Sequence, residues 1–289
     1  MSRLISDKFK DWEKLCDERF SKLKSNEEKL NRFFIALYGI GDEISAEVND
    51  NDVTVRRADL QREIKSLISF AVGCIFGRYS VDRDGLCYAG GAWDGSAYST
   101  IIPCPDNIMT LNDSKSGLTA AVTDFIEKVY GSDTLDANLE FITEVLGGSG
   151  DAQTFLYNYL KRCFFADHSK TYKNRPIYWQ ITSGRKNAFT AYMYLHRYNS
   201  SFINVLLEKY AQPHYEKLSR SLDDLRKAHK LTTGAEKAAL RRDISRLQTL
   251  LLEMDGFIHR LDLLSKQNIT IDLDDGVKAN YEKLSDILV

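Results

Sequence analysis

Cysteine and long apolar runs are both scarce in this chain of 289 residues. Its five cysteines are scattered, odd in number and without a CxxC pair, so they indicate neither a disulfide framework nor a zinc site. Reduced thiols of this kind are typical of an intracellular protein. No apolar run approaches the roughly 20 residues that span a bilayer, and the charged N-terminal segment lacks the apolar core of a signal peptide. We therefore expect a cytoplasmic protein with no membrane partner.

Motifs for cofactor-dependent chemistry on nucleotides are lacking as well. The four prolines include no adjacent pair, so the chain has no Asn/Asp-Pro-Pro-aromatic loop, which amino-group methyltransferases use to hold a flipped base. There is no Walker A sequence. Gly39 and Gly41 follow a helical segment, whereas the glycine-rich turn of a methyl-donor site must follow a strand. We therefore expect that this chain by itself is not an enzyme and binds no cofactor.

The charges almost cancel over the whole chain but are segregated along it. The net charge is −2, with 28% charged and 43% hydrophobic residues, which is typical of a globular protein. Residues 161–198 carry eight Lys or Arg against one acid, with nine aromatic residues between them. Residues 106–151 carry nine Asp or Glu against two Lys. Any surface for a polyanion must therefore be local.

Two interpretations of residues 161–198 remain open. Cations attract phosphate and exposed aromatic rings stack on bases, so the segment is a candidate nucleic-acid surface. Alternatively, the aromatic side chains form a core and the cations are its solvated rim. Residues 183–187 (Ser-Gly-Arg-Lys-Asn) are the sharpest candidate within the segment, because the glycine permits a tight turn that presents three polar side chains together.

The candidate DNA-binding residues follow from this charge and turn chemistry. Arg reads guanine and Asn reads adenine through bidentate hydrogen bonds, while Lys neutralises phosphate. An ordinary turn with charged side chains is the alternative. The predicted DNA-binding residues are Lys173, Arg175, Arg185, Lys186 and Asn187, with Arg78 as a further candidate.

Other motifs are weaker. Glu63 and Lys65 match half of a metal-dependent nuclease site, but this tripeptide is common in charged helices. Residues 272–276 suggest a calcium loop, yet its glycine is one position early and the twelfth position is Lys283 rather than Glu. A turn with solvated carboxylates fits better. The five histidines show no ligand spacing, and we expect no metal site.

The apolar pattern predicts a mostly helical α+β fold. Helical spacing predicts helices over residues 7–38, 58–76, 117–130, 135–146 and 151–165. A capping box at Ser25 and Glu28 predicts that a second helix begins at Asn26 within the first of these ranges. Residues 85–102 are predicted to form short strands or an irregular loop. Residues 175–182 are predicted to form a strand, and residues 188–198 a strand or a short helix.

Residues 201–266 show a different pattern. Apolar residues recur every three or four positions on both sides of Thr232-Thr233-Gly234, which predicts an antiparallel, coiled-coil-like helical hairpin. The predicted organisation is an N-terminal helical region (1–84), an α+β region (85–200), the helical hairpin (201–268) and a C-terminal tail (269–289) that packs on the rest.

Islands of sequence also resemble a known family. They comprise residues 23–32, 38–40, 42–43, 62–74, 76–80, 88–91, 175–198, 271–278 and 280–281. In order and spacing these islands resemble the C-terminal half of PglX-type adenine methyltransferases of BREX phage-defence systems, and the related type IIG restriction-modification proteins. The resemblance covers most of the chain, and only residues 92–152 match poorly.

The resemblance implies a role without catalysis. In that family the methyltransferase domain lies N-terminal to this region. The resemblance implies that residues 1–84 are a helical spacer region and that residues 85–200 are a target-recognition-like region. The chain therefore resembles a PglX protein without its catalytic domain, and S-adenosylmethionine is expected only for that missing domain. The implied partners are double-stranded DNA, the catalytic domain and other defence-system proteins. The alternative is a protein-interaction module that docks to those defence components, and an autonomous nuclease is the third possibility.

Overall fold

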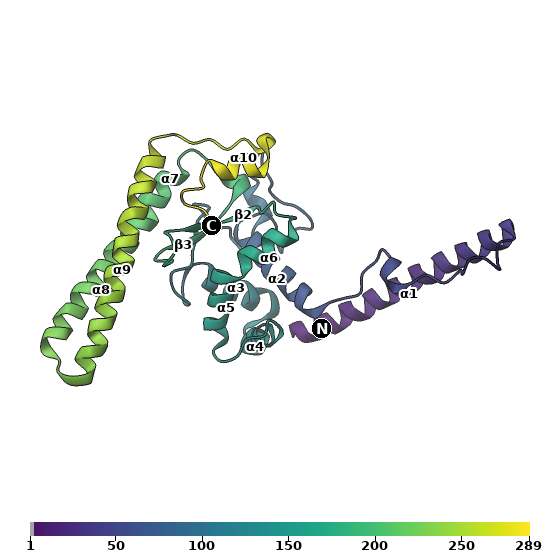
Figure 1. The fold of residues 1–289 in the computed structure, drawn as a ribbon, viewed down its shortest axis with the longest axis horizontal. Coiled ribbons are helices and arrows are strands. Elements are labelled where there is room, and N and C mark those ends of the chain that lie inside the picture. Colours follow the sequence, from purple (N-terminus) through teal and green to yellow (C-terminus); the bar gives the residue numbers. More distant parts are fainter. Residues whose placement is uncertain (1–2) are drawn as a thin grey trace. The chain divides into compact units, whose positions relative to one another are not determined.

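A computed structural model describes residues 3–289. The chain is mostly helical with a small three-stranded antiparallel sheet (Figure 1), so the predicted fold class is confirmed. The helices are α1 (Ile5–Tyr38), α2 (Leu60–Ile75), α3 (Gly117–Tyr130), α4 (Leu135–Val145), α5 (Ala152–Arg162), α6 (Phe164–Thr171), α7 (Phe202–Val205), α8 (Gln212–Leu231), α9 (Gly234–Ser265) and α10 (Gly276–Glu282). The strands are β1 (Met109–Thr110), β2 (Tyr178–Thr182) and β3 (Thr190–Tyr194). Short 3-10 turns and one π-helical segment, η5 (Leu206–Ala211), complete the described elements.

Two compact units make up the chain, and each is discontinuous in sequence. Unit 1 comprises Met1–Leu67 and Ile126–Ser149, and unit 2 comprises Ile68–Phe125 and Gly150–Val289. This division differs from the four predicted regions. Compact units are set by contacts between segments that lie far apart in sequence, and a pattern read along the chain does not contain them. The helical hairpin and the C-terminal tail belong to the same unit as the sheet.

In unit 1, α1 is a single helix of 34 residues. The predicted new helix start at Asn26 is wrong, because the helix continues through Ser25 without a break. Ser in a helix interior is only a few tenths of a kcal/mol worse than a good helix former, and no Gly or Pro interrupts this stretch. The helix ends at Gly39, whose φ of 66° is the left-handed conformation of a C-terminal cap.

The segment after α1 runs back along the same helix. Lys24 Nζ lies 2.7 Å from an Asp50 carboxylate oxygen, and the Arg57 guanidinium is paired with Asp17 at 2.7 Å. Arg57 also lies 4.1 Å from the centroid of the Phe20 ring. These contacts give the long helix a partner in the middle of its length, which favours its continuity over the predicted break.

In unit 2 the sheet has the order β1-β3-β2. Strands β2 and β3 pair over five residues, with Trp179 opposite Met193 and Thr182 opposite Thr190. The C-terminal residues extend the sheet, because Thr182 N–H donates to Ile287 O and Val289 N–H donates to Gln180 O. Both strands are buried on both faces, so their sequences read as nearly continuous apolar and aromatic runs.

The aromatic residues of residues 161–198 are therefore mainly core. Trp179 and Phe189 lie in the cluster that α9 covers, where the Phe189 and Phe257 rings stack at 5.5 Å. On the other face, Tyr192 makes an edge contact with Phe164 of α6 at 5.5 Å. All five rings are fully buried or nearly so. Of the two open interpretations, the aromatic core is correct for these side chains, and base stacking on them is excluded because solvent does not reach them.

The predicted helical hairpin is present in unit 2, where α8 and α9 run side by side (Figure 1). Its first arm follows η5, and Pro213 stands at the start of α8. Proline lacks an N–H and clashes with the carbonyl four residues earlier, which accounts for a local π-helical register at that point. The buried residues of α9 are Leu251, Met254, Phe257, Leu261 and Leu264, which follow one another at the predicted spacing of three or four.

Residues 85–102 form an irregular loop that contains one 3-10 turn, η2 (Gly95–Ala97), rather than strands. The Asp82 carboxylate holds the loop by accepting hydrogen bonds from the N–H groups of Ser99 and Thr100 and from the Thr100 hydroxyl. These bonds lower the pKa of Asp82, with the Thr100 bonds contributing most. A carboxylate that takes over backbone donors in this way replaces the ladder bonds that strands would supply.

Candidate nucleic-acid interface

The predicted turn connects β2 to β3. Asn187 N–H donates to Gly184 O at 3.0 Å and closes the turn. Gly184 has a φ of 143° and Asn187 a φ of 50°, both in the region that most side chains avoid. Glycine adopts such angles freely, and asparagine tolerates the left-handed region better than most residues. The sequence Ser-Gly-Arg-Lys-Asn therefore folds locally as its turn chemistry requires.

Glu253 of α9 holds this turn from the helical hairpin. Its carboxylate accepts hydrogen bonds from the Ser183 hydroxyl at 2.7 Å, from Lys186 N–H at 2.7 Å and from Ala188 N–H at 3.0 Å. A Cβ added at Gly184 would lie 3.0 Å from Glu253 Oε2. A side chain at position 184 would therefore crowd the Glu253 carboxylate, which satisfies donors that the short turn leaves unpaired.

The electrostatics of the Glu253 contact favour its charged form. Partial burial raises the pKa of the carboxyl group, but the hydrogen bonds from Ala188, Lys186 and Ser183 outweigh burial, so the pKa lies below its ordinary value. Arg260, two turns further along α9, donates to Ser183 O at 2.7 Å. Sequence reasoning missed both residues. The available signal was an acid and a base seven residues apart in the apolar arm of the hairpin.

Arg185 and Lys186 are exposed at the tip of the turn. Within residues 3–289, neither side chain forms an ion pair. Asn187 is different, because its side-chain oxygen accepts a hydrogen bond from the Thr182 hydroxyl at 3.1 Å. That bond and the left-handed backbone give Asn187 a role in forming the turn. The two cations are the groups that the turn presents to solvent.

Lys173 and Arg175 lie elsewhere, in the loop between α6 and β2. Lys173 and Asn174 both have positive φ angles, 52° and 60°, so the loop reverses sharply before the strand. Both cations are exposed. This loop precedes β2 and the turn follows it, so a strand of five residues, about 16 Å long, separates the two pairs of cations. The structure therefore gives two separate cationic places at opposite ends of one strand.

Arg78 lies inside a tyrosine network. Its guanidinium donates to the Tyr194 hydroxyl at 2.8 Å and to the Tyr79 hydroxyl at 3.1 Å, and the side chain is half-buried. Tyr194 in turn donates to Tyr88 O at 2.8 Å. These bonds explain why an arginine stands at this position without any contact to DNA. We therefore leave Arg78 out of the candidate interface.

His168 lies beside the first residues of β2. Its Nε2 accepts hydrogen bonds from Ile177 N–H at 3.0 Å and Tyr178 N–H at 3.2 Å, and the ring stacks on Tyr178 at 4.6 Å. Burial lowers the pKa of His168 to about 3, and the positive charge of Arg78 acts in the same direction. The neutral ring therefore ties the loop that carries Lys173 and Arg175 to the first residues of β2.

No family model matches the chain. It is 42% identical over 283 residues to the adenine-specific methyltransferase PglX of Lacticaseibacillus casei (strain Zhang). It is 36% identical over 261 residues to the adenine-specific methyltransferase BrxX of Escherichia coli O9:H4 (strain HS). The chain is a homologue of one region of the PglX-type methyltransferases. The recognition of their C-terminal region from sequence islands is confirmed.

The match covers nearly all of this chain and a small part of each PglX-type relative. It takes in 95% and 84% of the chain, but only 24% and 21% of the length of the two relatives. The chain thus spans between a fifth and a quarter of the curated proteins that it matches. What those proteins do as whole molecules does not follow for this region from similarity alone.

The weaker motifs have structural explanations. The Glu63 carboxylate is paired with Arg62 at 2.7 Å. Asp272 accepts a hydrogen bond from Asp274 N–H at 3.0 Å, and Asp275 is paired with Lys283 at 3.2 Å, so the acidic segment forms a capped turn. Among the described residues, no group of three or more His, Cys, Asp or Glu side chains could hold a metal ion. No helix found within residues 3–289 has the length and apolar character that crossing a membrane requires.

Proposed function

We propose that this chain is a DNA-binding, target-recognition region of an adenine-specific DNA methyltransferase that serves a phage-defence system of the BREX or type IIG kind. Methyl transfer would take place in a separate catalytic domain that binds S-adenosylmethionine, and this chain would neither bind the methyl donor nor transfer the methyl group. The homology to PglX and BrxX supports the methyltransferase part of the proposal.

One observation carries the DNA-binding part. The β2–β3 turn presents Arg185 and Lys186 to solvent, and a carboxylate from another element, Glu253, fixes its backbone. Cations on a fixed turn lose less conformational freedom on binding than cations on a mobile loop. Arginine suits a phosphate or a guanine edge because its guanidinium donates two parallel hydrogen bonds. Lysine suits phosphate as a compact charge.

Lys173 and Arg175 take a secondary role in the proposal. They lie at the opposite end of β2 and make no ion pair within the described chain. A duplex that contacts the turn would meet them only if it follows the length of the strand. We assign them phosphate contacts, which position a duplex and carry no sequence information.

The test compares wild type with an Arg185→Ala, Lys186→Ala double variant in a salt series on a labelled duplex. Each phosphate contact contributes about 0.9 to the slope of log affinity against log salt, so the double variant should lower the slope by about 1.8. The matched control is Arg226→Ala, Lys227→Ala on α8, which removes the same two residue types from pairs with Asp223 and Asp224. The control should bind as wild type does.

Equal affinities and slopes for wild type and the Arg185, Lys186 variant would contradict the proposal and favour the protein-interaction module. If Arg185 reads guanine, its loss should cost about 1–3 kcal/mol on a cognate duplex and little on unrelated DNA. If both residues contact only phosphate, the loss should be equal on all duplexes. Comparing several duplexes at one salt concentration separates these two roles.

A further inference from the structure

A groove of about 400 Å³ lies beside the β2–β3 turn in unit 2. Its walls come from α5, the turn, α8 and α9. Four of the residues that line it are cations: Lys161, Arg162, Lys186 and Arg246. Among the lining residues, all of them in the described part of the chain, none carries a carboxylate. The chain as a whole has 41 acidic residues against 39 Lys and Arg, so a groove with four cations and no carboxylate does not follow from the average composition.

Hydrogen bonds connect the elements that form the groove. Lys161 Nζ donates to the Tyr157 hydroxyl at 3.0 Å and to Asn187 O at 3.3 Å, which ties α5 to the turn. His214 Nε2 lies 2.9 Å from Ala188 O and ties α8 to the residue after the turn. Glu253 of α9 holds the same residue, Ala188, by its N–H. Each of the three helices therefore has a hydrogen bond to the turn segment.

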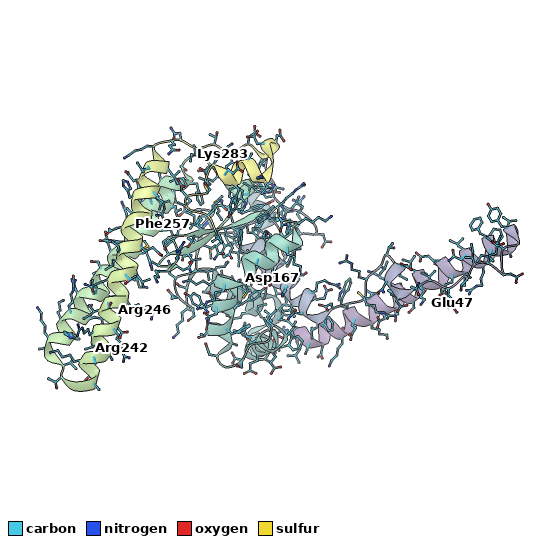
Figure 2. All side chains as sticks on the ribbon, viewed as in Figure 1. Glu47, Asp167, Arg242, Arg246, Phe257 and Lys283 are labelled. Carbon is cyan, nitrogen blue, oxygen red and sulfur yellow. The ribbon has the colours of Figure 1, made fainter. Side chains whose placement is uncertain are left out.

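The arginines of the groove are available for a ligand. Within residues 3–289, Arg162 and Arg246 form neither an ion pair nor a side-chain hydrogen bond. Arg242 lies one helical turn beyond Arg246 on α9 (Figure 2), and it too makes no ion pair in the described chain. Residues four apart share one helix face, about 6 Å apart along the axis. The row of cations thus continues from the groove along α9.

We propose that this groove binds the sugar-phosphate backbone of the DNA, with Arg162 and Arg246 each contacting a phosphate. This proposal rests on the proposed function and names a site that the turn residues alone do not define. A fork of two N–H donors fits phosphate oxygens, and a row of such groups fits a polymer of phosphates better than one small anion. The face of α9 that carries Arg242 and Arg246 is then the part of the helical hairpin that contacts DNA.

The experiment uses the whole chain and a labelled mixed-sequence duplex in a salt series, since phosphate contacts do not depend on sequence. The variant is Arg162→Ala, Arg246→Ala, which leaves Arg185 and Lys186 in place. Its slope of log affinity against log salt should fall by about 1.8 relative to wild type. The matched control is again Arg226→Ala, Lys227→Ala on α8, whose slope should not change. Thermal melting checks that each variant is folded.

A second variant, Arg162→Lys, Arg246→Lys, keeps both charges and should retain the wild-type slope. A groove alanine variant that binds with wild-type affinity and slope, while the Arg185, Lys186 variant binds less tightly, would overturn the groove and leave the proposed function standing. Absence of duplex binding by the wild-type chain at low salt would overturn both. If the slope of log affinity against log salt falls in the alanine variant and the lysine variant does not restore it, the assignment of these contacts to phosphate is wrong.

Discussion

The sheet layer of unit 2 and the outer half of its helical hairpin differ in how far their apolar side chains are buried. In the sheet layer, Trp179, Tyr192 and Phe257 have no exposed surface. In the outer half of the hairpin, the half nearest the loop that joins α8 to α9, Leu247 is only half-buried and Leu231 is 87% exposed. A layer covered on both faces is fixed by shape and apolar area. A pair of helices with one shared seam keeps most of its side chains in water, where charged groups remain available for a partner.

The largest expected effect breaks the sheet layer. Replacing Phe257 with Ala should lower the free energy of unfolding by about 3–5 kcal/mol, because the ring is fully buried against Phe189 and its removal leaves a cavity. Chemical denaturation of the whole chain measures this change. A loss below about 1 kcal/mol would mean that α9 does not cover the sheet as the packing indicates.

The next effect lies at the junction between the two regions. Replacing Glu253 with Ala removes the acceptor of three hydrogen bonds, including those of Lys186 N–H and Ala188 N–H. Hydrogen bonds to charged groups contribute about 1.5–3 kcal/mol each, and partial exposure reduces this, so we expect a loss of about 2 kcal/mol. Because the pKa of Glu253 is below its ordinary value, its contribution is present above pH 4.5 and is lost as the pH falls through the folded pKa. Hydrogen exchange of the Lys186 and Ala188 amides should rise in the variant, whereas unchanged protection would contradict the contact.

Acid should weaken the sheet layer through His168. Its pKa is about 3 in the folded chain against 6.5 ordinarily, so the unfolded chain binds the proton more readily and stability falls as the pH drops below 6.5. At pH 5.5 this residue alone should reduce the free energy of unfolding by about 1.4 kcal/mol relative to pH 7.5. His196 and His214 also have pKa values below the ordinary one, mainly through burial, and act in the same direction. Denaturation of wild type and of His168→Gln at both pH values measures how much of the change in the free energy of unfolding comes from His168. A variant whose free energy of unfolding changes with pH as much as that of wild type would contradict the prediction.

The smallest effect belongs to the outer hairpin. Replacing Leu247 with Ala should cost about 1 kcal/mol, well below a buried leucine, because its side chain is only half-buried in the seam. The exposed neighbour Arg241 serves as a control, and its replacement with Ala should change stability by less than about 0.5 kcal/mol. Melting shifts for Leu247→Ala as large as those for Phe257→Ala would show that the two halves of the hairpin are equally packed.

The sequence determined the elements whose cause is local. Apolar spacing specified α2, α3, α4 and the two arms of the hairpin, and glycine chemistry specified the β2–β3 turn, because each depends on residues within a few positions of one another. The one false helix start, at Asn26, came from a local signal that α1 outweighs through its length and its contacts with the returning segment.

Only the tertiary structure decided which polar and aromatic residues remain available. Arg78 and Arg185 look alike in the sequence, yet one donates to two tyrosine hydroxyls and the other stands unpaired on a turn. The partners of a charge come from distant segments, such as Tyr194 for Arg78 and Glu253 for the turn, and no pattern along the chain records them. Burial on both faces of the sheet likewise assigned the aromatic rings to the core. Charge and aromatic content are properties of sequence, but exposure and pairing arise only from the contacts that folding makes.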